Sequence, residues 1–127
     1  MNDARHYPQQ MPLDAYGNGG FRFAGLSHRG GLLCLPGGMA AWPVTKPDEI
    51  TLESLAPVLA AADAIDVLLI GLGRDIVGLD PVIRARLREH RIIVEAIATG
   101  GAVRTYNVLL AEQRAVAAAL IAVDSVR

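Results

Sequence analysis

The chain has 127 residues, of which 52% are apolar, 20% are charged and 5% are aromatic, and its formal net charge is -1. This length suits one domain that buries a core without metal or disulfide support, and the composition excludes extensive disorder. The near-neutral charge excludes the strongly basic class of nucleic-acid-binding proteins. The longest apolar run, residues 115–123, is too short to cross a membrane as a helix.

The start of the chain and its cysteine content bear on the cellular compartment. Residues 1–15 lack the apolar stretch of a signal peptide, and we expect a flexible N-terminal tail there, followed by a single α/β domain over residues 16–127. Cys34 lies between two leucines and has no second cysteine to pair with, so it is predicted to be a core residue. The three histidines are not at metal-ligand spacing. We therefore expect a cytoplasmic protein without a metal or a cofactor.

The first predicted element is a β-hairpin over residues 21–35. Apolar residues flank the segment 27–31, whose serine, histidine and glycines are typical of a turn. Pro36-Gly37-Gly38 is expected to end the hairpin. Trp42-Pro43 and Lys46-Pro47 favour extended backbone after it, because a proline disfavours the helical conformation of the residue before it.

A short helix is predicted over residues 54–62. Leu52, Leu55 and Leu59 repeat at the spacing of one helical face. Ser54 is the expected N-cap, which places Pro57 in the first turn, where its missing N–H is tolerated.

Two strands and two helices are predicted to alternate over residues 65–110. The segments 65–70 and 91–97 are rich in β-branched residues and read as buried strands. Asp80-Pro81 is a start signal for a helix that ends near residue 90, and Thr99-Gly100-Gly101 opens another helix that continues to residue 110. The order strand, helix, strand, helix indicates a βαβ crossover and a sheet that is parallel there.

The last segment, residues 114–123, has two interpretations. Its alanines favour a helix, whereas a run of nine apolar residues between polar flanks is typical of a buried strand. Periodicity alone does not decide between them.

Candidate binding residues gather where the two predicted parallel strands end. Gly71, Gly73 and Arg74 follow one strand, and Thr99, Gly100, Gly101 and Arg104 follow the other, so both groups should meet at the edge where open α/β folds form a crevice. The N-terminus of a helix and two guanidinium groups favour an anion. The simpler alternative is that the glycines form strand-to-helix turns and the arginines are solvated.

Two further residues are candidates near this crevice. Asn107 lies three residues after Arg104, on the same helical face, and is expected either to bind a ligand or partner or to tie neighbouring loops together. Trp42 is either a surface anchor at the rim of the crevice or, as the favoured alternative, a core residue.

Six short motifs occur along the chain in a fixed order: Tyr16-Gly17, Gly20-Phe21-Arg22-Phe23, Leu35-Pro36, Trp42-Pro43-Val44, Leu69-Ile70-Gly71-Leu72-Gly73, and Thr99 with the segment from Arg104 to Leu110. Together they resemble the Mth938-like family, a domain of unknown function, over residues 13–123. The resemblance implies a three-layer α/β fold with helices packed on a mixed central sheet, in which the last segment is an antiparallel strand. Ala98 and Val103 depart from the family pattern, which often has an acidic residue and a cysteine there.

The resemblance also implies a set of binding or assembly proteins without established catalysis, of which the mitochondrial branch helps to build respiratory complex I. Our leading hypothesis is therefore a non-enzymatic protein-binding or assembly module that uses the crevice. The alternative is a site for a small anionic molecule, or a weak enzyme with acid–base chemistry from Asp75 or Tyr106. Self-association into a homo-oligomer is a third hypothesis.

Overall fold

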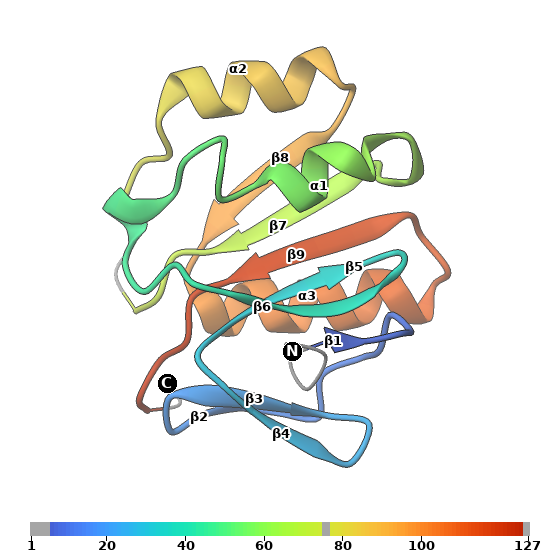
Figure 1. Cartoon of the computed structure of the whole chain (residues 1–127), viewed down its shortest axis with the longest axis vertical. Helices are drawn as coiled ribbons and strands as arrows, with labels where there is room; N and C mark the ends of the chain where they lie inside the picture. Colours follow the sequence, from blue (N-terminus) through green and yellow to red (C-terminus); the bar gives the residue numbers. More distant parts are fainter. Residues whose placement is uncertain (1–5, 75–76, 126–127) are drawn as a thin grey trace.

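The computed structural model describes residues 6–74 and 77–125, which form two β-sheets and three α-helices. A six-stranded sheet has the order β1-β6-β5-β9-β7-β8, and a three-stranded antiparallel sheet has the order β2-β3-β4 (Figure 1). The strands are β1 (His6–Tyr7), β2 (Ala15–Gly17), β3 (Gly20–Phe23), β4 (Leu26–Arg29), β5 (Gly31–Leu35), β6 (Gly38–Trp42), β7 (Val67–Gly71), β8 (Ile93–Ile97) and β9 (Val116–Leu120). The helices are α1 (Ala56–Ala60), α2 (Pro81–Glu89) and α3 (Thr99–Ala111), with single 3-10 turns at Pro47–Glu49 and Ala62–Ala64.

The six-stranded sheet is the middle of three layers. Because side chains alternate along a strand, Leu68 and Ile70 of β7 pack with α1 and α2 on one face, whereas Leu69 packs with α3 and the small sheet on the other. Figure 1 shows α2 above the sheet and the small sheet below it. The predicted three-layer α/β fold with a mixed central sheet is therefore confirmed.

Strand β9 resolves the ambiguity of the last segment. It lies between β5 and β7, antiparallel to the first and parallel to the second. All five of its residues are buried, since they contribute to both cores. Burial on both faces of the sheet outweighs the helix propensity of alanine.

The predicted βαβ crossover is confirmed, with one correction. Strands β7 and β8 are parallel neighbours joined by α2, and the Asp80 carboxylate caps that helix by accepting the Val82 amide at 2.9 Å. Strand β8, however, is the edge of the sheet, and Ile93 is 63% exposed. The β-branched residues of β8 are typical of a buried strand, but its position at the edge of the sheet leaves several of its side chains exposed or only half-buried.

Two local predictions were wrong in their boundaries. The segment 27–29 belongs to β4, and the chain reverses instead at Ala24 and Gly25, which both have positive φ (52° and 76°), and again at Pro36-Gly37. Helix α1 begins at Ala56, and Ser54 does not cap it, because the Ser54 hydroxyl donates to the Thr51 carbonyl at 2.8 Å.

The segment before β2 is more firmly held than the flexible tail expected over residues 1–15. Strand β1 pairs with β6, and the Gln10 amide donates to the Val116 carbonyl at 2.7 Å. The Leu13 side chain is buried in the core beside α3. Residues 1–5 lie outside the described part of the chain. None of the helices in that part combines the length and the apolar character needed to cross a membrane.

Candidate functional site

The ends of β7 and β8 meet, as predicted, at the N-terminus of α3. The Leu72 amide donates to the Ile97 carbonyl at 2.8 Å, and the Thr99 amide donates to the Gly73 carbonyl at 2.9 Å. Gly73 turns the chain with a φ of 92°, a conformation that side-chain-bearing residues rarely adopt. The backbone therefore fixes where Arg74 leaves the sheet relative to α3.

Two of the predicted site residues are structural. The fully buried Thr99 hydroxyl accepts the Gly73 amide at 3.0 Å and donates to the Ile121 carbonyl at 2.7 Å, so it joins the ends of β7, β9 and α3. A Cβ atom on Gly71 would lie 2.9 Å from the Thr99 hydroxyl oxygen, so this glycine permits α3 to pack against β7. Both residues are buried and neither lines the cavity described below.

Five predicted residues line one shallow cavity of about 290 Å³, which we call the crevice. They are joined by residues from β2, from the N-cap of α3 and from the segment after β9. The full lining is Tyr16, Gly73, Arg74, Ala98, Gly100, Gly101, Arg104, Val123 and Ser125.

The crevice is rich in hydrogen-bond donors. Arg74 and Arg104 are both exposed, and the Arg104 guanidinium folds back over the first turn of α3, with Nη1 3.6 Å from the position of a Cβ on Gly100. Ala98 at the N-cap offers no capping side chain. Among the described residues, the Gly100 and Gly101 amides find no acceptor. Such a surface attracts carboxylates and other anions.

Asn107 and Trp42 lie outside the crevice. Asn107 accepts the Leu13 amide and donates to the Leu13 carbonyl, both at 2.8 Å, so it ties the N-terminal segment to α3 as the structural alternative predicted. Trp42 is buried on the α1 and α2 side of the sheet, where its indole N–H donates to the Ser54 carbonyl at 2.8 Å. The rim position for Trp42 was therefore wrong, and its core alternative is confirmed.

Of the two acid–base candidates, Tyr106 is not available in the crevice. Tyr106 is fully buried, and its hydroxyl donates to the Met11 carbonyl at 2.7 Å. Asp75 lies outside the described residues. Within the described part of the chain, no group of three or more His, Cys, Asp or Glu residues is placed to hold a metal ion.

Tyr106 and Cys34 form a buried pair of weak acids on the α3 side of the sheet. Burial raises the pKa of the Cys34 thiol far above its ordinary value, and the neighbouring Tyr106 hydroxyl offsets only part of this effect. Burial also raises the pKa of Tyr106, and the neighbouring Cys34 raises it further. Cys34 is thus an inert core thiol, as predicted, because a reactive cysteine needs an accessible thiolate.

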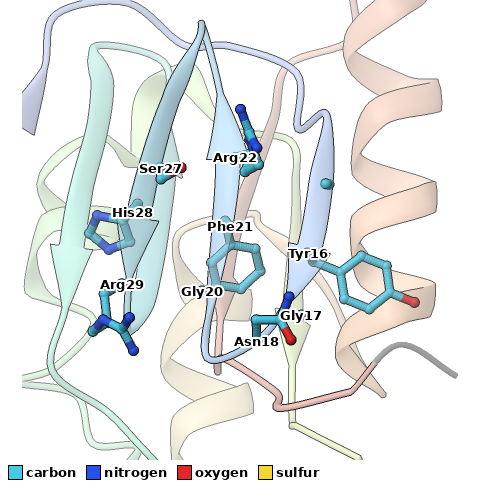
Figure 2. Close-up of a pocket in the computed structure, with 10 residues that line it drawn as sticks. Tyr16, Gly17, Asn18, Gly20, Phe21, Arg22, Ser27, His28 and Arg29 are labelled. Atoms are coloured by element: carbon cyan, nitrogen blue, oxygen red, sulfur yellow. The ribbon is translucent and has the colours of Figure 1, made fainter.

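Sequence reasoning missed the contributions of Tyr16 and Ser125 to the crevice. The Tyr16 hydroxyl rests against Gly100, where a Cβ would lie only 2.5 Å from its oxygen. Ser125 is brought in because the Asn18 and Gly19 amides donate to the Asp124 and Val123 carbonyls, both at 2.9 Å. No local pattern signals these long-range contacts. A second hollow, on the small sheet, was also not predicted (Figure 2).

Sequence comparison relates most of the chain to known proteins. A family model described as a protein of unknown function (DUF498/DUF598) matches residues 13–121. An uncharacterized protein of Rhodobacter capsulatus is 43% identical over 111 residues, covering 87% of this chain and 84% of that protein. The NADH dehydrogenase (ubiquinone) 1 alpha subcomplex assembly factor 3 of Xenopus tropicalis is 33% identical over 111 residues, covering 87% of this chain but only 61% of that protein.

Solved structures share the fold. One described as an outer membrane protein from Bartonella henselae has a TM-score of 0.89 and 51% identity, covering 93% of this chain and 99% of that chain. A Mth938-like domain of Bordetella pertussis has a TM-score of 0.75 and 29% identity, covering 92% of this chain and 89% of that chain. The resemblance indicated by the six sequence motifs is confirmed.

Proposed function

Because the chain belongs to the DUF498/DUF598 family of proteins of unknown function, we propose that it is a non-enzymatic protein-binding module of the assembly-factor kind. The crevice is its contact surface. The observation that carries the proposal is the similarity, across 87% of this chain, to a protein named as an assembly factor of NADH dehydrogenase. A protein partner in the cytoplasm, in the most specific case a component of respiratory complex I, follows as part of the proposal.

The geometry of the crevice supports contact with a partner more than catalysis. Its floor is rigid, because Thr99 joins three elements beneath it, whereas Arg74 and Arg104 are exposed at its surface. Arginine is favoured in protein interfaces, where its planar fork pairs with carboxylates. Tyr106 is the acid–base candidate that the structure describes. Its hydroxyl donates a hydrogen bond to the Met11 carbonyl and cannot reach a substrate in the crevice.

Affinity capture under mild crosslinking tests this proposal. The tagged protein would be expressed in its own organism as wild type, Arg74→Glu, Arg104→Glu and Arg88→Glu. Arg88 is exposed on α2, away from the crevice, and is the matched charge-reversal control. We expect the wild type and the control to capture the same protein, and each crevice variant to capture at least about tenfold less, since opposed like charges weaken an interface.

The outcomes divide clearly. Equal capture by all four proteins, or recovery of the chain alone, would overturn the proposal, and the second result would point to self-association instead. Circular dichroism of each variant shows that a loss of capture is not a loss of fold.

A second candidate function is binding of a small anionic molecule in the crevice, either alone or with weak catalysis. The observation that favours it is the pair of Gly100 and Gly101 amides, which lie beside two guanidinium groups and find no acceptor among the described residues. A thermal-shift screen of phosphates and carboxylates tests it, because a ligand at 100 times its Kd stabilises the folded state by about 2.7 kcal/mol. This candidate function would be excluded if no compound raised the melting temperature of the wild type more than that of Arg104→Gln.

A further inference from the structure

A second hollow of about 370 Å³ lies on the three-stranded sheet, formed by β2, β3, β4 and the turn between β2 and β3 (Figure 2). Arg22 and Ser27 lie at one end of it, and Arg29 and Asn18 lie at the other. The Tyr16 side chain points away from the hollow toward α3. The hollow is therefore separate from the crevice, although Tyr16 borders both.

The alternation of side chains explains why this face is both hollow and charged. Phe21 and Phe23 are buried in the core beneath the small sheet, so the intervening Arg22 projects from the opposite face. Ser27 pairs with Arg22 in the antiparallel register, and Arg29 follows two residues later on the same face. The neighbouring positions on this sheet are Ala15, Gly17 and Gly20, which have little or no side chain.

Gly20 keeps the middle of the hollow open for a structural reason. A Cβ on this residue would overlap the backbone carbonyl of His28. The close approach of β3 and β4 therefore requires glycine, and no longer side chain can fill the space between the two arginines.

The two arginines have no ion-pair partner in the described chain. Neither Arg22 nor Arg29 has a carboxylate oxygen within 4.0 Å among the described residues. The ion pair present in that part of the chain joins Arg86 and Glu89 on α2. The Asp124 carboxylate lies near Arg29, because both side chains approach Gly19. A Cβ on Gly19 would be 3.9 Å from the Asp124 Oδ1 and 3.8 Å from the Arg29 Nη1. Asp14 precedes β2, and its amide donates to the Arg22 carbonyl at 2.8 Å. The guanidinium groups thus remain open to an external anion.

We propose that this hollow binds a small dicarboxylate, with one carboxylate at Arg22 and the other at Arg29. A guanidinium group presents two parallel N–H donors that match one carboxylate. The arginines lie at opposite ends of the hollow, so a molecule that carries two separated carboxylates satisfies both at once. The Ser27 hydroxyl and the Asn18 amide supply further donors at the two ends. This site goes beyond the protein-binding role proposed for the crevice.

Titration of the whole protein with succinate, glutarate, adipate and the monocarboxylate butyrate, followed by amide chemical shifts, tests the proposal. We expect at least one dicarboxylate to bind at least about tenfold more tightly than butyrate, because the second carboxylate binds intramolecularly once the first is held. Shifts should centre on β3, β4 and Asn18. Arg22→Gln and Arg29→Gln should each reduce dicarboxylate affinity to that of butyrate.

Three control variants sharpen the test. Arg88→Gln removes the same charge on α2 and should leave dicarboxylate binding to the hollow unchanged, whereas Arg104→Gln removes a charge from the crevice and reports whether the dicarboxylate binds there instead. Asp124→Asn removes a carboxylate near Arg29 and should strengthen binding. The proposal is overturned if no dicarboxylate binds more tightly than butyrate, if the shifts centre on the crevice, or if Arg104→Gln weakens binding as much as Arg22→Gln. All of these variants alter exposed side chains, and the amide spectrum of each reports whether it is folded.

Discussion

Thr99 is the buried polar side chain on which the site depends most. Its hydroxyl bonds both the Gly73 amide and the Ile121 carbonyl, which belong to segments 26 and 22 residues away in the sequence. The sequence placed Thr99 in the crevice as a binding residue, because its position after a strand is the same for a ligand contact and for an internal bond. Only the three-dimensional arrangement separates these roles.

Removing that hydroxyl should destabilise the fold. Thr99→Val keeps the shape but leaves a buried donor and a buried acceptor unsatisfied, and we expect the free energy of unfolding to fall by about 2–4 kcal/mol. Thr105→Val is the control on the same helix, since Thr105 is half-buried and makes no described side-chain hydrogen bond. Urea denaturation measures both variants, and equal stability of the two would contradict the assigned role of Thr99.

The buried weak acids Cys34 and Tyr106 should make stability depend on alkaline pH. Their pKa values are raised in the folded state, so below the ordinary thiol pKa of about 8.5 both states hold the protons and this stabilisation is complete. Above this pH the unfolded chain releases the Cys34 proton, and above the ordinary tyrosine pKa of about 10 it also releases the Tyr106 proton, whereas the folded chain retains both. The free energy of unfolding then falls by up to about 1.4 kcal/mol per pH unit for each group that titrates.

The contribution of the Cys34 thiol to this alkaline loss of stability can be measured separately. We expect Cys34→Ala to show a shallower loss of stability than the wild type between about pH 8.5 and pH 10, whatever its stability at neutral pH. Urea denaturation across this range measures the two slopes. Identical slopes would mean that Cys34 is not held as a buried neutral thiol.

At the scale of elements, the predicted boundaries were correct where the segment itself contains the residues that start the helix and form its buried face. Helix α2 combines Asp80, a first-turn proline and an apolar stripe at Ile83 and Leu87, and it begins and ends where these predict. The reversal before β4 was misplaced because Ala24 at positive φ carries no sequence signal. Strand β8 was taken as buried because the order of strands across a sheet is not written in the strand itself.

Within the N-terminal segment, the backbone of Leu13 is held by one side chain of α3. Asn107 holds both backbone groups of Leu13, so Asn107→Ala should loosen the segment and speed exchange of the Leu13 amide at least about tenfold relative to the wild type. Asn107→Asp retains the acceptor for that amide and should have a smaller effect. Hydrogen exchange by NMR measures all three proteins, and unchanged protection in Asn107→Ala would show that Leu13 is held by its burial alone.

At the scale of the whole molecule, the crevice is assembled from segments that only the fold brings together. The alternation of strands and helices correctly placed Gly73 and Arg74 beside Gly100 and Arg104. Tyr16 and Ser125 come from opposite ends of the chain, and Trp42 is on the other side of the sheet. The sequence therefore predicted the crevice residues that follow β7 and β8, but not those that come from the two ends of the chain.

If a partner protein binds at the crevice, a photo-crosslinking amino acid placed there should form a covalent adduct with it. The probe would replace Arg104 in the crevice and, in a separate control, Arg88 on α2. We expect the living cell to yield an adduct with one partner protein from position 104 and little or none from position 88. Adducts of equal yield from both positions, or from position 88 alone, would contradict binding at the crevice.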